Sequence, residues 1–232
     1  MTGTDVTGTA RTALVTGANR GLGLAVATEL AARGHRVLCA ARDEPAAARA
    51  AARASGDTAA LALDVTDPGA VRAAAAEHAV DILVNNAGVL LDQGSAPSVA
   101  DLELVRRSLD VNLLGTWRVT QAFLPGMVDR GWGRVVNVSS GAASFAYGPA
   151  PGCPGYTASK VALNALTTML AQEVKGTGVL VNAINPGLVR TRMQPLAEQT
   201  AEEAARHIAD AATLPDDGPC GVFLRRDTVI EW

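Results

Sequence analysis

The chain has only three cysteines, Cys39, Cys153 and Cys220, among its 232 residues. Their number is odd, their spacings are wide and no C-x-x-C pair occurs, so neither a disulfide framework nor a zinc site is predicted. The histidines are scattered, and none has Cys, Asp or Glu at ligand spacing, so we expect no metal site. Three reduced thiols are typical of a cytoplasmic protein, and we expect that location.

An excess of basic charge and long apolar runs are also missing. The net charge is -3, and no basic patch or basic amphipathic helix indicates a nucleic-acid partner or a membrane surface. No apolar stretch is long enough to span a bilayer. The first ten residues are small and polar and lack the basic start and apolar run of a secretory signal. We predict a flexible tail at residues 1–10.

Short apolar runs alternate with helical patterns along the rest of the chain. Continuous apolar strands are predicted at 12–16, 36–41, 59–63, 81–84, 134–138 and 179–184, with an edge strand at 222–224. Helices are predicted at 22–33, 45–54, from 67 onward, 101–130, 156–175 and 201–212. This alternation is typical of a parallel sheet covered on both faces. We therefore predict an α/β fold in which residues 11–232 form one domain: a doubly wound parallel sheet of about seven strands.

A glycine-rich loop, TGANRGLG, joins the first predicted strand to the first predicted helix. Such a loop brings backbone N–H groups to a pyrophosphate, and the helix N-terminus adds positive potential. Gly17 would make the tight turn, Gly21 would allow close approach, and Gly23 would let the helix pack on the sheet. We predict a Rossmann-type dinucleotide site at Gly17, Asn19, Arg20, Gly21, Leu22 and Gly23.

The end of the second strand indicates which nicotinamide cofactor binds. An acidic residue there would bind the ribose hydroxyls of NAD, but the position holds Ala41, followed by Arg42. The guanidinium groups of Arg20 and Arg42 would suit a 2'-phosphate, which they can grip through several donors. Asp43 would repel that phosphate, and we expect it to point outward. The predicted cofactor is NADPH/NADP+.

Tyr156 and Lys160 lie four residues apart, on one face of a predicted helix. A free tyrosine titrates near pH 10, and a neighbouring ammonium lowers that pKa. Tyr156 could then donate a proton to a carbonyl oxygen while a hydride arrives on carbon. This pair alone is a weak signal, because both residue types are common on helix surfaces.

Further polar residues stand where a substrate would bind. Ser139 and Ser140 follow the strand at 134–138, and ligands bind at such carboxyl ends of parallel strands. A serine hydroxyl there can hydrogen-bond a substrate oxygen. Asn112 lies inside a predicted helix, where asparagine is unfavourable, and is either functional or a buried group bonded to backbone.

Together these motifs resemble the short-chain dehydrogenase/reductase family over nearly the whole chain. The glycine loop has that family's T-G-x-x-x-G-x-G spacing, and NNAG at 85–88, DV at 64–65 and NPGLVRT at 185–191 are similar to three more of its motifs. The resemblance implies that Asp64 and Val65 meet the adenine. It also implies that the segment 185–191 holds the nicotinamide carboxamide and that the cofactor contacts Asn86, Ala87, Gly88, Tyr156, Lys160, Pro186, Gly187, Val189 and Thr191.

The resemblance implies a catalytic tetrad of Asn112, Ser140, Tyr156 and Lys160. Tyr156 would be the acid in reduction, and Lys160 would lower its pKa and hold the nicotinamide ribose. Ser140 would orient the substrate carbonyl, and Asn112 would fix a water that links Lys160 to solvent.

The segment 141–155 is a few residues longer than the family spacing. It leaves open whether Ser139 or Ser140 is the catalytic hydroxyl. It places Phe145, Tyr147 and Cys153 near the mouth of a substrate pocket. Met193, two residues after Thr191, is either a fourth pocket residue or plain packing.

Residues 202–232 are similar to the end of the family's carbonyl-reductase-like branch, which usually takes NADPH and accepts ketones, aldehydes and quinones. We therefore expect an NADPH-dependent ketoreductase acting on a small-molecule carbonyl compound. The alternatives are another reaction on this fold, such as imine reduction, epimerisation or cyclisation, and a non-enzymatic NADP-binding regulator. Monomeric members of the branch carry a long insertion before the tyrosine, which is short here, so a homodimer or homotetramer stays open.

Overall fold

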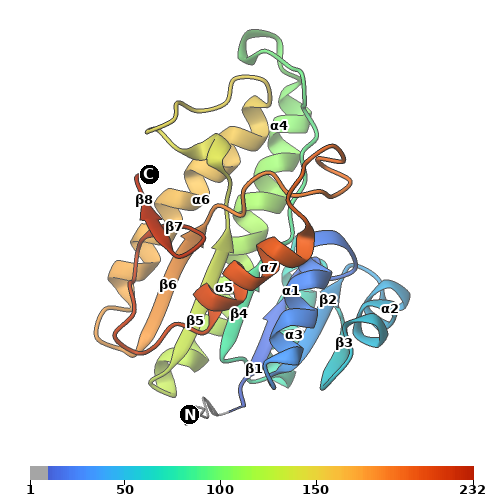
Figure 1. Ribbon diagram of the computed structural model, residues 1–232, viewed down its shortest axis with the longest axis vertical. Coiled ribbons are helices and arrows are strands. Elements are labelled where there is room, and N and C mark those ends of the chain that lie inside the picture. Colours follow the sequence, from blue (N-terminus) through green and yellow to red (C-terminus); the bar gives the residue numbers. More distant parts are fainter. Residues whose placement is uncertain (1–9) are drawn as a thin grey trace, which may run out of the picture.

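The computed structural model describes residues 10–232 and contains one eight-stranded sheet with the order β3-β2-β1-β4-β5-β6-β7-β8 (Figure 1). The strands are β1 (Thr12–Val15), β2 (Arg36–Ala41), β3 (Thr58–Ala62), β4 (Ile82–Asn85), β5 (Gly133–Val138), β6 (Val179–Ile184), β7 (Phe223–Arg225) and β8 (Thr228–Ile230). Strands β1 to β7 are parallel, and β8 is antiparallel to β7. The tail predicted at residues 1–10 lies outside the described residues except for its last residue.

Seven α-helices in the described chain cover the sheet: α1 (Gly21–Ala32), α2 (Glu44–Ala54), α3 (Pro68–Glu77), α4 (Leu102–Leu109), α5 (Thr116–Asp129), α6 (Pro154–Glu173) and α7 (Ala201–Ala212). One apolar core joins α1, α2 and α7 to one face of the sheet, and a second core joins α3, α5 and α6 to the other. The predicted α/β fold with helices on both faces is confirmed. No helix within residues 10–232 is both long and apolar enough to cross a membrane.

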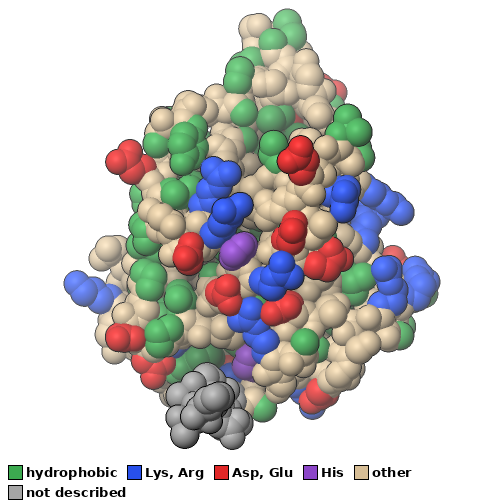
Figure 2. All heavy atoms as spheres, in the orientation of Figure 1, with side chains coloured by type: hydrophobic (Ala, Val, Ile, Leu, Met, Phe, Trp, Pro, Cys, Tyr) green, Lys and Arg blue, Asp and Glu red, His purple; other side chains and the backbone are tan. Residues whose placement is uncertain are grey.

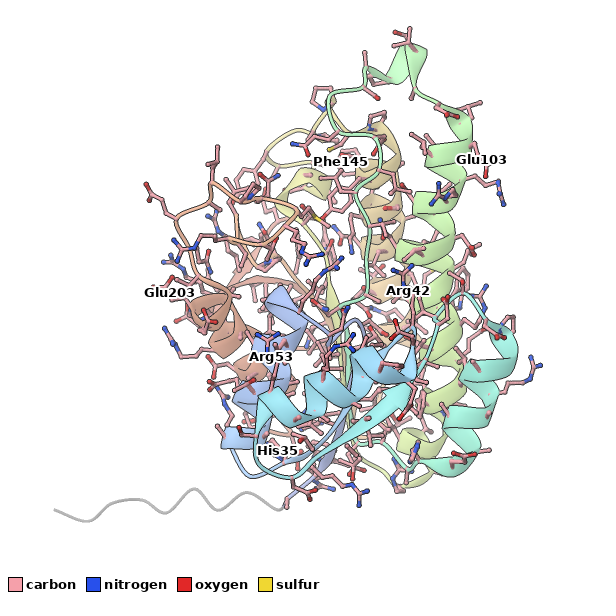
Figure 3. All side chains as sticks on the ribbon, turned by 90° about the vertical axis from the view of Figure 1, so that its right-hand side faces the viewer. His35, Arg42, Arg53, Glu103, Phe145 and Glu203 are labelled. Carbon is pink, nitrogen blue, oxygen red and sulfur yellow. The ribbon has the colours of Figure 1, made fainter. Side chains whose placement is uncertain are left out.

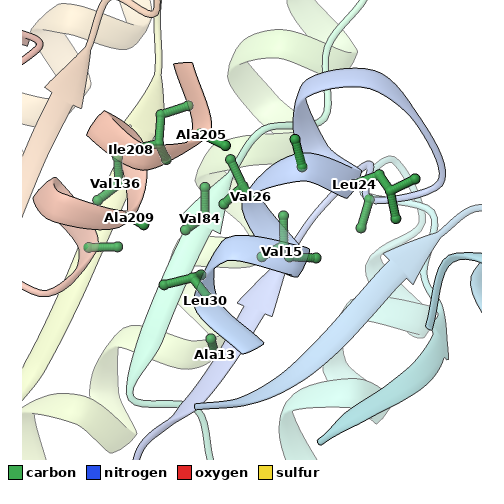
Figure 4. Close-up of a cluster of buried hydrophobic side chains, with 14 of the residues drawn as sticks. Ala13, Val15, Leu24, Val26, Leu30, Val84, Val136, Ala205, Ile208 and Ala209 are labelled. Atoms are coloured by element: carbon green, nitrogen blue, oxygen red, sulfur yellow. The ribbon is translucent and has the colours of Figure 1, made fainter. Parts of the chain in front are cut away.

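Helices α1 and α7 lie side by side over the centre of the sheet (Figure 4). Val26 and Leu30 of α1 and Ile208 of α7 are fully buried in the core between these helices and the strands. Removing them from water supplies roughly 1.5–3 kcal/mol per large side chain. The outer surface of the same helices carries charges of both signs (Figure 2), including the ion pair between Arg33 and Asp210 at 2.9 Å. This packing fixes the start of α1 against the carboxyl end of β1.

Two element predictions need correction. The sheet has eight strands instead of about seven, because residues 223–230 form a hairpin. The last strand was not predicted because it is only three residues long and because its turn, at Arg226 with φ 57°, has no Asn-Gly signal. The helix predicted at 101–130 is α4 and α5 joined by a π-helical turn at Asp110–Gly115. A Cβ on Gly115 would lie 2.7 Å from Val65 Cγ2, so a glycine lets this turn pack closely on the chain after β3.

The strand order reverses between β1 and β4. At such a point the loops leaving the two strands diverge and open a crevice beyond their carboxyl ends, where ligands bind in open parallel sheets. Every predicted site motif follows the carboxyl end of a strand or lies on a helix beside those ends. The sheet therefore brings motifs far apart in sequence to one edge.

Candidate active site

The glycine loop and the segment after β4 are joined through Thr16. Its hydroxyl accepts hydrogen bonds from the backbone N–H groups of Asn86 and Ala87, both at 3.0 Å. The Asn86 side chain returns a bond to the Thr16 carbonyl at 2.9 Å. Thr16 is itself buried. The two loops at the switch point therefore form one rigid unit.

The glycines of this loop leave room that any larger residue would fill. A Cβ on Gly23 would lie 2.3 Å from the Gly17 carbonyl oxygen and 2.4 Å from Asn86 Nδ2. Gly17 and Gly21 have φ values of 65° and 52°, in the left-handed region that favours glycine. The loop therefore comes close to the sheet, as the predicted dinucleotide site requires.

The N-terminus of α1 is suited to an anion. Within residues 10–232 no side chain caps it, and its first turn has no acidic residue. By contrast, Asp43, Asp67 and Thr200 cap α2, α3 and α7 with their side chains. The first N–H groups of a helix have no intrahelical acceptor, and the helix dipole adds positive potential there. The glycine cradle and this open helix end fit a cofactor pyrophosphate.

The segment after β6 closes over the same loop. A Cβ on Gly21 would lie 3.4 Å from Thr191 Cγ2, so the loop and Thr191 are neighbours. Gly187 takes φ 84°, and its N–H donates to the Asn185 side chain at 3.0 Å. The glycine loop and the segment predicted to hold the nicotinamide carboxamide are thus neighbours in the fold.

Two exposed arginines, one after β1 and one after β2, and a carboxylate that caps a helix follow the carboxyl ends of these strands. Ala41 is buried, and Arg42 and Arg20 are exposed. Asp43 Oδ1 accepts the Ala46 N–H at 2.8 Å, which makes it the cap of α2. Arg42 lies beyond the carboxyl end of β2, whereas His35 lies at the opposite edge of the sheet (Figure 3).

Asp64 and Val65 follow β3 on the adenine side of the predicted site. Asp64 Oδ1 accepts from the Thr66 N–H at 2.9 Å and from the Thr66 hydroxyl at 2.7 Å. Val65 is buried, and its carbonyl accepts from Arg118 at 2.6 Å. These contacts hold both residues firmly at the carboxyl edge.

Tyr156 and Lys160 stand one turn apart in α6. Lys160 is only 4% exposed, and its Nζ donates to the Val138 carbonyl at 2.7 Å. The same Nζ lies 5.9 Å from the centroid of the Tyr156 ring. A Cβ on Gly88 would lie 3.7 Å from Lys160 Nζ and 3.3 Å from Asn112 Oδ1. The motif after β4 therefore adjoins the tyrosine–lysine pair.

Burial controls the proton affinity of both groups. It lowers the pKa of Lys160 from 10.5 to about 8. It raises the pKa of Tyr156 above 10, a shift that a hydrogen bond from Ser140 reduces and the nearby Cys153 increases. Burial is thus the largest influence on the Tyr156 pKa in the folded chain, and the lowering by Lys160 stays a prediction for the complex with the cofactor. At neutral pH Tyr156 is a phenol that can donate a proton.

The two serines after β5 have different surroundings. Ser139 is buried, and its hydroxyl donates to Asn164 Oδ1 at 2.6 Å. Ser140 is half-buried, lies near enough to the Tyr156 phenol to lower its pKa, and accepts the Ala142 N–H at 3.2 Å. The geometry favours Ser140 as the hydroxyl that a substrate could meet.

Asn112 lies in the π-helical turn and is fully buried. Its side chain accepts the Val89 N–H at 2.8 Å and donates to the Val89 carbonyl and to Ser159 Oγ, both at 2.9 Å. Ser159 in turn donates to the Tyr156 carbonyl at 2.6 Å. Asn112 thus connects the segment after β4 to the first turn of α6, and π-helical turns are frequent at functional sites.

The predicted mouth residues lie on two segments near the carboxyl edge. Phe145 and Tyr147 are 67% and 62% exposed, Met193 is exposed, and Cys153 is half-buried at the start of α6. The Trp232 carbonyl accepts the N–H groups of Phe145 and Ala146 at 3.0 and 3.2 Å.

Several polar residues behind the site are not among the residues predicted from the sequence. Thr16 opens the glycine motif and could have been included with it. Asn137 donates to Thr167 at 2.9 Å and accepts from Asn85 at 2.9 Å, forming a buried bridge below the serines. Asp92 binds the start of α6. Asp92 and this bridge have no local sequence signal, because their partners lie far away in the chain.

Residues 11–202 match the family model described as short chain dehydrogenase. A protein of Streptomyces virginiae, named as a ketoacyl reductase of the monensin polyketide synthase, is 40% identical over 215 residues, covering 84% of this chain and 80% of that protein. The structure of a 3-oxoacyl-[acyl-carrier protein] reductase with bound NAD from Brucella melitensis is 29% identical, with a TM-score of 0.83 over 93% of this chain and 88% of that one. A gluconate 5-dehydrogenase from Burkholderia cenocepacia with NADP and tartrate is 28% identical, with a TM-score of 0.84 over 94% and 93%.

The chain belongs to the short-chain dehydrogenase/reductase family. It is therefore an oxidoreductase with a nicotinamide cofactor and a small-molecule substrate. The fold and the family that the motifs predict are both confirmed. The similar structures include a complex with NAD and a complex with NADP.

Proposed function

We propose that the protein reduces a ketone or aldehyde with NADPH, with Tyr156 as the proton donor. The observation that carries this proposal is the meeting of Tyr156, Lys160 and Ser140 beside Gly88, next to a glycine loop and an uncapped helix that fit a pyrophosphate. The bound cofactor would supply the hydride. The similarity to a ketoacyl reductase supports a carbonyl group as the acceptor.

The residues of the chain then have distinct roles. Ser140 hydrogen-bonds the substrate carbonyl oxygen, and Tyr156, a phenol at neutral pH, protonates that oxygen as the alcohol forms. Lys160 holds the nicotinamide ribose and passes a proton to Tyr156. Asn112, held by the Val89 backbone, would fix a water that links Lys160 to solvent and resupplies the proton.

The preference for NADPH rests on the end of β2. Arg20 and Arg42 are exposed at the edge where the adenosine ribose would lie, and Ala41 leaves no carboxylate there to repel a 2'-phosphate. The cap that Asp43 places on α2 engages its carboxylate with a backbone N–H. Asp64 and Val65 would line the adenine, and Pro186, Gly187, Val189 and Thr191 would hold the nicotinamide carboxamide. The cofactor would also contact Asn86, Ala87 and Gly88.

The substrate pocket has an apolar mouth. Phe145, Tyr147 and Met193 are exposed there and would contact apolar groups next to the carbonyl, with Cys153 deeper in the pocket. A carbonyl compound with an apolar substituent fits this rim better than a small polar one.

The test is oxidation of NADPH and of NADH, followed by absorbance, with a panel of ketones, aldehydes, diketones and quinones. We expect turnover with NADPH and at least tenfold lower kcat/KM with NADH. Tight NADPH binding without reduction of any carbonyl would contradict the proposed reaction. Equal use of NADH would contradict the proposed cofactor.

A further inference from the structure

The segment between β4 and α4 crosses the start of the helix that carries Tyr156. Asp92 lies in this segment and is only 2% exposed. Its Oδ2 accepts the Gly155 N–H, and its Oδ1 accepts the Tyr156 N–H at 3.4 Å. Two residues further on, Gly94 N–H donates to the Gly152 carbonyl at 2.7 Å. The segment is thus joined to both sides of the first residue of α6.

The N–H groups at the start of α6 have few other acceptors, although Thr157 also donates to the Ala150 carbonyl at 2.9 Å. Pro154 has no N–H, and Cys153 at the N-cap position makes no side-chain cap. The first bond from the helix back to the N-cap residue is Thr157 N–H to the Cys153 carbonyl at 2.8 Å. The N–H groups of Gly155 and Tyr156 have no acceptor within the helix, as expected for a first turn. Asp92 therefore provides the cap that the local sequence lacks.

The fit around this cap is close. A Cβ on Gly155 would lie 2.9 Å from the Val105 Cα and 3.0 Å from Asp92 Oδ2. Among residues 10–232 no basic side chain forms an ion pair with Asp92. A buried carboxylate without a cation needs other compensation, which here comes from the two N–H groups and the positive end of α6.

We propose that Asp92 is a positioning residue for proton transfer by Tyr156, an inference that rests on the proposed function. The far end of the tyrosine–lysine pair is held independently, because Lys160 binds the Val138 carbonyl of β5. Loss of the Asp92 carboxylate would free the N–H side of the first turn, loosen Tyr156 although its carbonyl stays bound to Ser159, and leave the Lys160 end in place. A misplacement of about 1 Å at a reacting group can lower the rate about 100-fold.

The same segment links three parts of the site. It begins with the motif Asn86–Gly88, continues to Val89, whose backbone binds Asn112, and reaches Tyr156 through Asp92. The position of the Tyr156 phenol is thereby set relative to the motif Asn86–Gly88 as well as to the rest of α6. Asp92, which makes the last of these contacts, is not one of the four residues of the predicted tetrad.

The experiment compares Asp92→Ala and Asp92→Asn with wild type and with Asp67→Ala. Asparagine keeps one acceptor oxygen but turns an amide group toward the second N–H. Asp67 is the matched control, because it also accepts two first-turn N–H groups, those of Gly69 and Ala70, but on a different helix, α3. The measurements are kcat, substrate KM, the Kd of NADPH, and hydrogen exchange in residues 150–160.

We expect kcat to fall about 10- to 100-fold in Asp92→Ala and less in Asp92→Asn, with the Kd of NADPH and the substrate KM within about threefold of wild type. Exchange in residues 150–160 should accelerate only in the Asp92 variants. Asp67→Ala should lose stability and keep its kcat. Unchanged kcat in Asp92→Ala would overturn the proposal, and so would a parallel loss of NADPH binding, which would mean a general structural role.

Failure of the proposed function gives a different result. If wild type reduces no carbonyl compound, hydrogen exchange decides by itself whether Asp92 holds the first turn of α6. Faster exchange confined to residues 150–160 in Asp92→Ala supports the clamp, and unchanged exchange there overturns it.

Discussion

Replacing Lys160 with methionine should stabilise the chain while removing its activity. Lys160 is buried, and burial lowers its pKa from 10.5 to about 8. At about 1.4 kcal/mol per pKa unit, the folded chain pays roughly 3 kcal/mol to keep this ammonium charged. Methionine has a similar length and no charge to desolvate. The lost bond from Nζ to the Val138 carbonyl would offset about 1 kcal/mol, which leaves a net gain of about 2 kcal/mol.

The gain should depend on pH in a defined direction. Below pH 8 the amine is protonated in the folded and unfolded states, and the full penalty is present. Between about pH 8 and 10.5 the folded chain loses this proton and the unfolded chain keeps it, so wild-type stability rises with pH relative to the variant. Above 10.5 both forms are neutral and the penalty disappears.

Thermal unfolding of the cofactor-free proteins from about pH 6 to 10.5 measures this effect, because bound NADPH would add its own stabilisation. For a chain of this length, 2 kcal/mol corresponds to roughly 4–8 °C in Tm at pH 7. Lys175→Met is the matched control, because Lys175 is exposed and should show no such trend. A variant less stable than wild type at pH 7, or a difference that does not shrink toward pH 10.5, would refute the reasoning.

Three further predictions concern the cofactor site and the loop that carries Phe145 and Tyr147. Gly23→Ala should raise the Kd of NADPH at least 100-fold in a fluorescence titration, because its Cβ would lie 2.3 Å from the Gly17 carbonyl; a Kd within twofold of wild type would count against the cradle. Arg42→Ala should weaken NADPH about tenfold and leave NADH unchanged, as expected for one lost charged hydrogen bond, whereas the exposed Arg49→Ala should affect neither. Trp232→Ala, which removes the ring stacked 5.4 Å from Phe223, should loosen the loop bound to the Trp232 carbonyl and raise the substrate KM several-fold at constant NADPH affinity. An unchanged KM would show that the loop is ordered without this stack.

The sheet, its helices and most of the site could be predicted because their signals are local. Continuous apolar strands, the glycine loop and the tyrosine–lysine spacing each depend on residues close together in the sequence. The six strands predicted at 12–184 occur at those positions within one or two residues. The clustering of the motifs follows from the topology, because parallel strands bring their carboxyl ends to one edge.

The features that were missed depend on contacts between distant segments. The direction of the Tyr156 pKa shift reflects burial by the folded chain, which the spacing to Lys160 does not show. The π-helical turn at Asn112 forms where Gly115 packs against Val65, fifty positions away in the sequence. Asp92 likewise caps a helix 63 residues further along. Such groups become visible only once the tertiary structure is known.

The measurement that tests the central claim most directly is NADPH-dependent carbonyl reduction by Tyr156→Phe beside Tyr147→Phe. These are the two tyrosines of the chain, and Tyr147 is exposed, with no lysine four residues later. We predict that Tyr156→Phe binds NADPH as wild type does but loses at least 100-fold in kcat, as expected for removal of a general acid, while Tyr147→Phe keeps its kcat. A Tyr156→Phe protein that reduces the same substrate within tenfold of the wild-type rate would contradict the assignment of Tyr156 as the proton donor.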